Sequence, residues 1–265
     1  MPSVEYEFQD LVGLLGRDFS VQELEGWIPM IGVGLESIDE RRIVLEVFPD
    51  RPDMLSIEGF ARALKGFLGV EKGFVEYRLG DSDVVLYVDK SVKNVRPFCA
   101  GAVVRDVVLD DYSVKSLMSI QEKLHLTHGR NRVKVAIGVH DLDRVEPPFT
   151  YTAVDPDSVS FVPLDMTEEL SLREILLEHP KGRDYAWTLD GASKYPLFVD
   201  KKGSVLSFPP IINGELTRLT EGSRNLFLEL TGTSQLAVDQ ALNILLCSIL
   251  DRGGKAYSIG LVEKK

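Results

Sequence analysis

Cysteine is scarce in this sequence of 265 residues, which contains only Cys99 and Cys247. Two cysteines cannot build the disulfide framework of a small secreted domain, nor the usual zinc site with four ligands. No apolar run approaches the roughly 20 residues that a membrane helix needs. The first ten residues, MPSVEYEFQD, are acidic and do not resemble a signal peptide. We therefore expect a cytoplasmic protein with no membrane segment.

Several motifs of catalytic chemistry are also missing. The chain has no G-x-S-x-G elbow, no Walker loop, no G-x-G-x-x-G turn and no catalytic-cysteine signature. His125 and His128 lie three residues apart in an expected helix, but no third ligand has a matching spacing, so we expect no metal site. An enzyme with this sequence would act through a positioned water rather than through a protein nucleophile.

Positive charge is in short supply, since the formal net charge is −11. This value argues against a general nucleic-acid binder, which needs a broad basic surface to neutralise phosphates. It does not exclude a protein that touches only the end of a nucleic acid. Arg130, Arg132 and Lys134 run against the acidic trend. These three cations are either a solvated charge run or phosphate contacts.

The composition and the hydrophobic patterns predict an α+β protein. A strand is expected over residues 43–48 and a helix over 54–68, ended by Gly69. Residues 80–83, Gly-Asp-Ser-Asp, read as a linker. We therefore expect a small N-terminal domain of mixed α and β structure over residues 1–83. A larger mixed-sheet domain with flanking helices should follow over residues 84–265.

The larger domain shows strand and helix signals in irregular order, unlike a doubly wound fold. Ser113 is expected to cap the first of its helices, Gly129 to end that helix, and a capping box at Ser171 to open a short helix that stops by Pro180. The expected strands are 84–88, 98–108, 132–140 and 225–231, and the expected long helices are 114–128 and 235–250.

Residues 195–213 predict a hairpin that ends in a rigid corner. Its strands, at 197–199 and 205–208, flank a Lys-Lys-Gly turn, and Pro209-Pro210 follows. Each proline fixes its own φ and favours extended geometry in the residue before it. The corner thus presents Ser207 and Asn213 on an apolar frame. It is either a plain proline-terminated hairpin or one wall of a small-molecule site.

Three further positions could carry chemistry, each with a structural alternative. Strand alternation places Glu229 on the face of Phe227 and Thr231, where it is either solvated or a ligand contact. The segment 232–234, Gly-Thr-Ser, either caps the last helix or offers free N–H groups to an anion or oxyanion. His140, at a strand end, is either structural or a group for hydrogen bonding and proton transfer.

Five segments, taken in order, resemble the N-terminal part of the phenylalanyl-tRNA synthetase β subunit in its archaeal and eukaryotic form. They are residues 48–62 (FPDRPDMLSIEGFAR), 121–125 (QEKLH), 136–143 (AIGVHDLD), 203–213 (GSVLSFPPIIN) and 225–233 (NLFLELTGT). The resemblance covers nearly the whole chain, and the family's β subunit is much longer. It implies that residues 84–265 are an editing domain, which hydrolyses tyrosine mis-esterified to phenylalanine tRNA.

The resemblance also implies roles for single residues. Glu229 matches the acceptor for the tyrosine hydroxyl, Ser207, Asn213 and Phe198 belong to the same pocket, and His140 lies near the ester. The Gly232-Thr233 backbone would hold the substrate carbonyl or the terminal adenosine. Arg130, Arg132 and Lys134 would contact the tRNA.

The implied partners are the 3′ end of phenylalanine tRNA, the synthetase α subunit and the rest of the β subunit, in an α2β2-type holoenzyme. Editing is expected to need no cofactor, whereas ATP and magnesium serve only the complete synthetase. Two alternatives stay open at this point. The chain could be a non-catalytic module for tRNA binding or subunit assembly, or a free-standing editing protein that works in trans.

Overall fold

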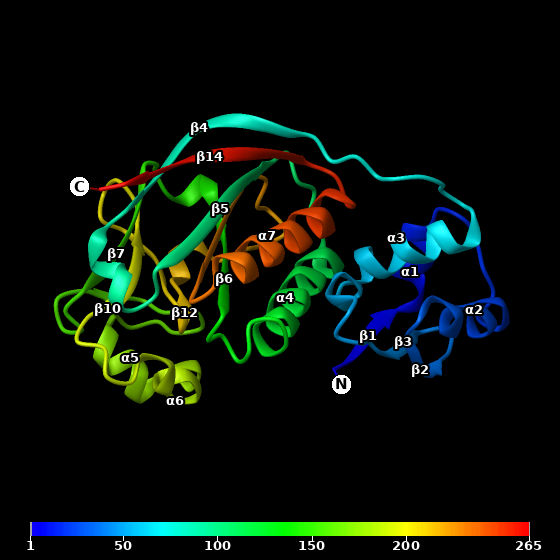
Figure 1. Cartoon of the computed structure of the whole chain (residues 1–265), viewed down its shortest axis with the longest axis horizontal. Coiled ribbons are helices and arrows are strands. Elements are labelled where there is room, and N and C mark those ends of the chain that lie inside the picture. The colour runs from blue at the N-terminus through cyan, green and yellow to red at the C-terminus, as the bar shows by residue number, and fades with distance from the viewer. Residues whose placement is uncertain (1, 265) are drawn as a thin grey trace.

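The computed structural model describes residues 2–264 and has two lobes (Figure 1). The smaller lobe, up to residue 68, is built on a three-stranded sheet, and the larger on a nine-stranded sheet. The α+β class predicted from the sequence is confirmed. Within residues 2–264, no helix is long and apolar enough to cross a membrane.

The small lobe packs its helices on one antiparallel sheet of strand order β1-β3-β2. The predicted helix over 54–68 is wrong at its start, because residues 52–55 form a 3₁₀ turn and the Ser56 side chain caps the helix that follows. The helix ends at Gly69, in the left-handed conformation (φ 69°) as predicted. The elements are β1 (Ser3–Glu7), α1 (Phe8–Leu15), α2 (Val21–Trp27), β2 (Gly34–Ile38), β3 (Arg42–Glu46) and α3 (Ile57–Leu68).

The predicted linker at residues 80–83 is wrong. These residues lie inside strand β4 (Leu79–Val88), where residues 79–81 pair with the start of β14 (Lys255–Glu263). The polar composition of Gly-Asp-Ser-Asp imitates a turn, but the pairing partner is about 175 residues away in sequence and cannot be read locally. The two lobes are instead connected by residues 69–78, which have no regular secondary structure and run across the top of Figure 1.

The large sheet has the strand order β12-β11-β10-β7-β4-β14-β5-β13-β6. Its pairings are antiparallel except for β4, which is parallel to both β14 and β7. Two further short strands, β8 (Ser160–Phe161) and β9 (Leu170–Ser171), pair with each other. The other strands are β5 (Phe98–Arg105), β6 (Val135–Asp141), β7 (Phe149–Val154), β10 (Tyr195–Val199), β11 (Val205–Phe208), β12 (Ile212–Asn213) and β13 (Leu226–Gly232).

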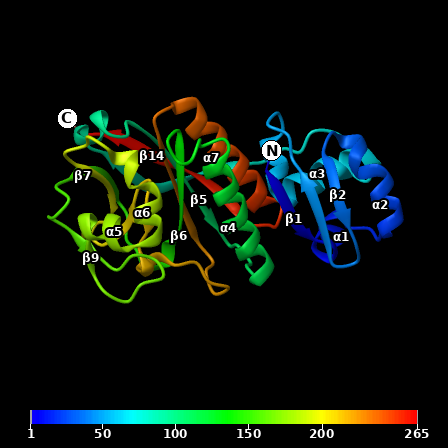
Figure 2. The same ribbon diagram turned by 90° about the horizontal axis from the view of Figure 1, so that it is seen from below.

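Two long helices, α4 (Asp111–Leu126) and α7 (Gln235–Leu250), lie side by side against β5, β6 and β13 (Figures 1 and 2). The prediction that Ser113 caps α4 is wrong, because Asp110 is the N-cap and Ser113 completes its capping box. The predicted capping box at Ser171 is confirmed. It opens α5 (Leu172–Glu178), and α6 (Pro180–Tyr185) follows.

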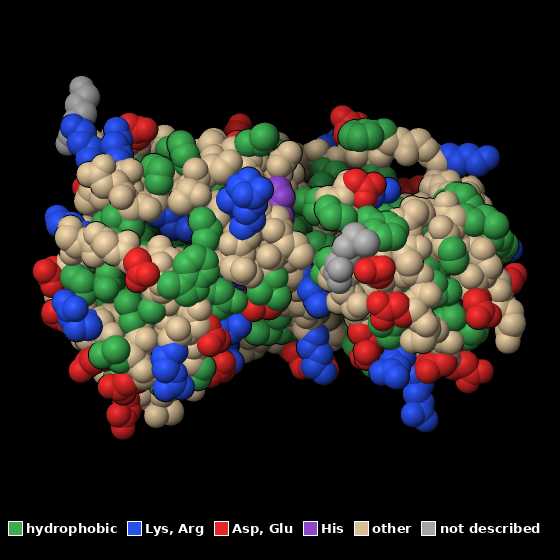
Figure 3. Space-filling view, turned by 60° about the horizontal axis from the view of Figure 1, so that its bottom comes forward, with side chains coloured by type: hydrophobic (Ala, Val, Ile, Leu, Met, Phe, Trp, Pro, Cys, Tyr) green, Lys and Arg blue, Asp and Glu red, His purple; other side chains and the backbone are tan. Residues whose placement is uncertain are grey.

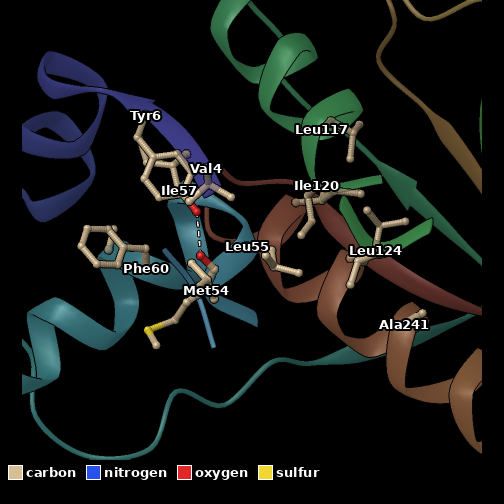
Figure 4. Close-up of a cluster of buried hydrophobic side chains, with 14 of the residues drawn as sticks. Val4, Tyr6, Met54, Leu55, Ile57, Phe60, Leu117, Ile120, Leu124 and Ala241 are labelled. Atoms are coloured by element: carbon tan, nitrogen blue, oxygen red, sulfur yellow. Dashed lines mark hydrogen bonds between the residues drawn. The ribbon is translucent and has the colours of Figure 1, made fainter. Parts of the chain in front are cut away.

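The hydrophobic core continues from one lobe into the other (Figure 4). Leu55 lies between the small lobe and the buried α4 residues Leu117, Ile120 and Leu124. Beside this core, Arg252 donates to Asp10 on α1 and Glu58 on α3, which adds ion pairs to the apolar joint. The two lobes therefore share one continuous core, and the site described next is lined by other residues of α4.

Candidate functional site

A cavity of about 300 Å³ lies between α4, the edge strand β6, strand β13 and the Pro209-Pro210 corner. Its polar lining comes from α4, α6 and strands near the two ends of the sheet, whereas the corner supplies apolar groups. The lining residues used below are Gln121, Glu122, His125, Arg132, Ala136, Ile137, Lys181, Ser207, Pro209, Pro210, Ile211, Asn213 and Glu229.

The sheet curls so that its two ends meet at this cavity. Ser207 on β11 donates a hydrogen bond of 2.8 Å to Glu229 on β13, although five strands separate them in the sheet order. Asn213 on β12 reaches the carbonyl of Val139 on β6, the opposite edge strand, at 3.5 Å. The predicted polar pair of the hairpin is thus brought to one site, and the hairpin is more than a plain turn.

Glu229 is a buried carboxylate in the floor of the cavity. Its exposure is 2%, so the alternative of a solvated face is wrong. Oε1 accepts the Ser207 hydroxyl, and Oε2 has no hydrogen-bond partner among residues 2–264. The neighbouring positions on the two flanking strands are glycines, Gly101 and Gly138. Gly138 leaves room for the carboxylate, since a Cβ there would lie 2.3 Å from Oε1, whereas a Cβ at Gly101 would meet Ile259 and the Leu228 carbonyl.

His140 lies beside this carboxylate but is itself fully buried and does not line the cavity. Its Nδ1 is 2.8 Å from the hydroxyl of Thr217, and its Nε2 is 3.7 Å from Oε1 of Glu229. The ring is stacked on Phe227, with the two centroids 6.2 Å apart. Alternation placed His140 on the right strand face, whereas its contact with Thr217 depends on a loop 77 residues away and had no signal in the sequence.

The Pro209-Pro210 corner is held in place by Arg132. The guanidinium donates to the carbonyls of Pro210 (3.1 Å) and Ile211 (2.7 Å), and it lies 4.2 Å above the ring of Tyr185. A left-handed turn delivers this side chain, since residues 130, 131 and 132 have φ values of 47°, 53° and 69°. The same turn explains why β6 begins at residue 135 rather than at the predicted residue 132.

Of the three cations expected to contact tRNA, one is buried and two are at least partly exposed. Arg132 is buried and committed to the wall of the cavity, so it is not an exposed cation available to phosphate. Arg130 is exposed and Lys134 is partly exposed on the same turn, and these two stay predictions. Acidic and basic side chains are interspersed over the face shown in Figure 3.

Glu122 connects three cationic or polar groups at the side of the cavity. Arg132 and Lys181 each donate to it at 3.0 Å, and His125 Nδ1 lies 3.4 Å away. These donors, with the hydrogen bond from His125 first, hold the pKa of the Glu122 carboxyl well below its usual range. Burial lowers the pKa of His125 to about 4, so His125 is neutral.

The edge of β6 is closed by side chains rather than by another strand. Ile137 donates its N–H to His125 Nε2 at 2.8 Å, and its carbonyl accepts from Gln121 at 2.7 Å. Such cover prevents an edge strand from pairing with other chains. Gln121 and His125 are four residues apart on one face of α4, a spacing that could have indicated their joint role in the sequence.

Three other predicted site residues lie elsewhere. Phe198 is a core residue stacked on Tyr151, with centroids 4.6 Å apart, and it does not line the cavity. Gly232 lies inside the sheet at the end of β13, between Val135 and Phe98. The expectation of free N–H groups is wrong for Thr233, whose N–H donates to the Lys134 carbonyl. Both Gly232 and Thr233 are outside the cavity lining.

We find no grouping of three or more histidine, cysteine, aspartate or glutamate side chains within residues 2–264 that could hold a metal ion. What the cavity offers is an apolar wall, a buried acceptor in its floor and cations at its side. Such a site can bind a small group with a hydrogen-bond donor at its tip.

Residues 109–245, which contain most of this cavity, match the family model of the B3/4 domain. The fold and the site are thus those of a B3/4-domain protein.

The chain is also similar to curated proteins of archaea. It is 48% identical over 266 residues to the phenylalanine–tRNA ligase β subunit of Methanothrix thermoacetophila, a match that covers 99% of this chain and 48% of the relative. The β subunit of Archaeoglobus fulgidus is 46% identical over 262 residues, with 99% and 47% covered.

A solved structure shows the same fold. It is an N-terminal fragment of the phenylalanyl-tRNA synthetase β-subunit from Pyrococcus horikoshii, with a TM-score of 0.95 and 39% identity over 99% of this chain and 77% of that one. The chain belongs to the family of phenylalanine–tRNA ligase β subunits. It spans about half the length of the curated relatives it matches.

Proposed function

We propose that this part of the β subunit hydrolyses tyrosine mis-esterified to the 3′ end of phenylalanine tRNA. The observation that carries the proposal is the buried carboxylate of Glu229, with its unpartnered Oε2, in the floor of a small cavity. A synthetic site for phenylalanine rejects an isostere that adds one hydroxyl by only about 10²-fold. A ligase for phenylalanine therefore needs a second site that recognises the hydroxyl of tyrosine.

The cavity fits such a second site in size and in chemistry. Its volume of about 300 Å³ is at the lower end of ligand pockets, which suits one amino-acid side chain. Pro209, Pro210 and Ile211 can pack on an aromatic ring, and a phenol hydroxyl can donate to Oε2 of Glu229. Phenylalanine would leave this oxygen without a partner. A hydrogen bond to a charged group contributes about 1.5–3 kcal/mol, or about 10- to 150-fold in favour of tyrosine.

The proposed chemistry is attack by a positioned water on the ester carbonyl. The Ser207 hydroxyl donates to Glu229, which supports a role in orienting the acceptor rather than in attacking the ester. The terminal ribose hydroxyl of the tRNA itself would lie beside the reacting carbonyl. The protein then contributes orientation and electrostatics and forms no covalent intermediate.

The test is deacylation of tyrosyl- and phenylalanyl-tRNA by the wild type and by Glu229→Ala, measured with the chain and with the complete ligase. We expect hydrolysis of tyrosyl-tRNA to fall about 10- to 150-fold. The matched control is Glu168→Ala, which removes an exposed carboxylate from the same lobe and should change nothing. An unaltered rate for Glu229→Ala would contradict the assignment of the acceptor.

We also propose the partners that the names of the relatives suggest. The chain would act in a ligase together with an α subunit and the remaining half of the β subunit, with Arg130 and Lys134 close to the tRNA end. If neither the chain nor the complete ligase deacylates tyrosyl-tRNA, the non-catalytic reading as a tRNA-binding or assembly module would replace the editing function.

A further inference from the structure

The surroundings of His140 favour one of its two tautomers. Thr217 is 1% exposed, and its hydroxyl oxygen lies 3.3 Å from the Gly214 carbonyl, an acceptor for its single hydrogen. A hydroxyl has one donor and two acceptor positions. The same oxygen is 2.8 Å from His140 Nδ1, and with its hydrogen given to the Gly214 carbonyl it accepts in this contact and Nδ1 donates. A neutral imidazole with a proton on Nδ1 has a bare lone pair on Nε2.

The bare Nε2 is directed to the carboxylate of Glu229 without bonding to it. The distance from Nε2 to Oε1 is 3.7 Å, beyond hydrogen-bond range, and Nε2 has no other partner in the described part of the chain. Oε1 already accepts from Ser207. Two acceptors thus face each other in a buried space. In this arrangement His140 does not donate a hydrogen bond to Glu229.

Two neighbours shape this geometry. Phe227 stacks on the imidazole, with an angle of 28° between the rings, and restricts its rotation. Gly138 leaves the space between the two groups open, because an added Cβ would lie 2.3 Å from Oε1 of Glu229 and 2.7 Å from Nε2 of His140. The imidazole of His140 and the carboxylate of Glu229 can therefore lie 3.7 Å apart because position 138 has no side chain between them.

We propose that Thr217 is a positioning residue that holds His140 in the tautomer protonated on Nδ1, and thereby keeps Glu229 free to accept a hydroxyl donor from the ligand. This inference rests on the proposed function of the cavity. With the proton on Nε2, or on both nitrogens, the imidazole would donate to Oε1 of Glu229 beside Ser207, and this second donor would weaken the carboxylate as an acceptor for a tyrosine hydroxyl at Oε2. Thr217 would then determine specificity through His140 and without touching the substrate.

The direct test is ¹⁵N NMR of the imidazole nitrogens in the wild-type chain, labelled at its four histidines. We expect His140 to show a protonated Nδ1 and an unprotonated Nε2 at pH 7.5. A protonated Nε2, or a ring with both protons, would overturn the inference whatever the activity of the protein.

The variants Thr217→Val and Thr217→Ser supply the functional part of the test. Thr217→Val removes the acceptor of Nδ1 and should move the proton to Nε2, with a decrease of about tenfold in tyrosyl-tRNA hydrolysis, the effect of about one hydrogen bond. Thr217→Ser keeps the hydroxyl and should restore both the tautomer and the rate. A merely structural role would change the rate without moving the proton.

The two proposals can fail separately. If His140 has the expected tautomer but Glu229→Ala deacylates tyrosyl-tRNA normally, the proposed function fails and the assignment of Thr217 to specificity fails with it. If Glu229→Ala is inactive but Thr217→Val leaves the tautomer and the rate unchanged, only the role of Thr217 is overturned.

Discussion

Replacement of Glu229 by methionine should lower editing and raise stability. The carboxylate is 2% exposed, and its Oε2 has no partner among the described residues. An unsatisfied buried acceptor costs about 1–3 kcal/mol, and more when it is charged. Methionine has a similar length and adapts to irregular space. It removes this cost but leaves the Ser207 hydroxyl without its partner, which lowers the free energy of unfolding by about 1 kcal/mol.

The net expectation is a gain of up to about 2 kcal/mol in the free energy of unfolding, or a rise of up to roughly 8 °C in Tm for a domain of this size. Adding Ser207→Ala should recover part of that roughly 1 kcal/mol, because it removes the buried hydroxyl that has lost its partner. Urea and thermal unfolding measure the stability, and tyrosyl-tRNA hydrolysis measures the activity. The two readouts should change in opposite directions.

The chain offers a matched control in Glu58, a second carboxylate that is 4% exposed but fully paired. It accepts from Ser116 and from Arg252. Glu58→Met breaks a buried ion pair and should cost about 3–5 kcal/mol. If Glu229→Met were destabilising to the same degree, Glu229 would be a structural residue, and the reasoning from its unpartnered oxygen would be refuted.

Three further predictions concern the walls of the cavity. The pKa of His125 is about 4 in the folded state and about 6.5 in the unfolded state, so the unfolded chain binds this proton first as the pH falls. Urea unfolding should therefore show a free energy of unfolding about 2 kcal/mol lower at pH 5 than at pH 7.5. The variant His125→Gln should remove this difference. Arg132→Met should cost roughly 2–3 kcal/mol in the same assay, and Arg132→Lys should not rescue it because the planar fork is lost. Gly138→Ala should lower tyrosyl-tRNA hydrolysis at least about tenfold by displacing Glu229, whereas Gly66→Ala, with no atom within 4 Å, should not.

Local patterns in the sequence were sufficient for most helices and strands. The capping box at Ser171 starts its helix where the structure has it. The pattern failed at Ser113 because both Asp110 and Ser113 are good capping residues and only the hydrogen bonds decide between them. It failed at residues 80–83 because their partner strand is the last one in the chain.

The site was harder to predict because it depends on the curl of a nine-stranded sheet. Strand alternation placed Glu229 and His140 on the correct faces, but whether those faces are solvated is decided by β11 and β12, which close the sheet from the far end. Arg132 was misread for the same reason. A cation in a charged run resembles a surface residue unless the corner that it supports is known to lie above it.

Three residues that lie side by side on strands β5, β13 and β6 show why the site departs from the local patterns. They are Gly101, Glu229 and Gly138. Glycine weakens a strand, and a buried carboxylate with a free oxygen costs stability, so each of the three residues violates what a stable sheet prefers. Local rules are broken mainly where function requires it. Here Gly138 makes room for the carboxylate and Thr217 keeps His140 from donating to it, so that one buried acceptor oxygen of Glu229, Oε2, stays without a partner among the described residues for a ligand to satisfy.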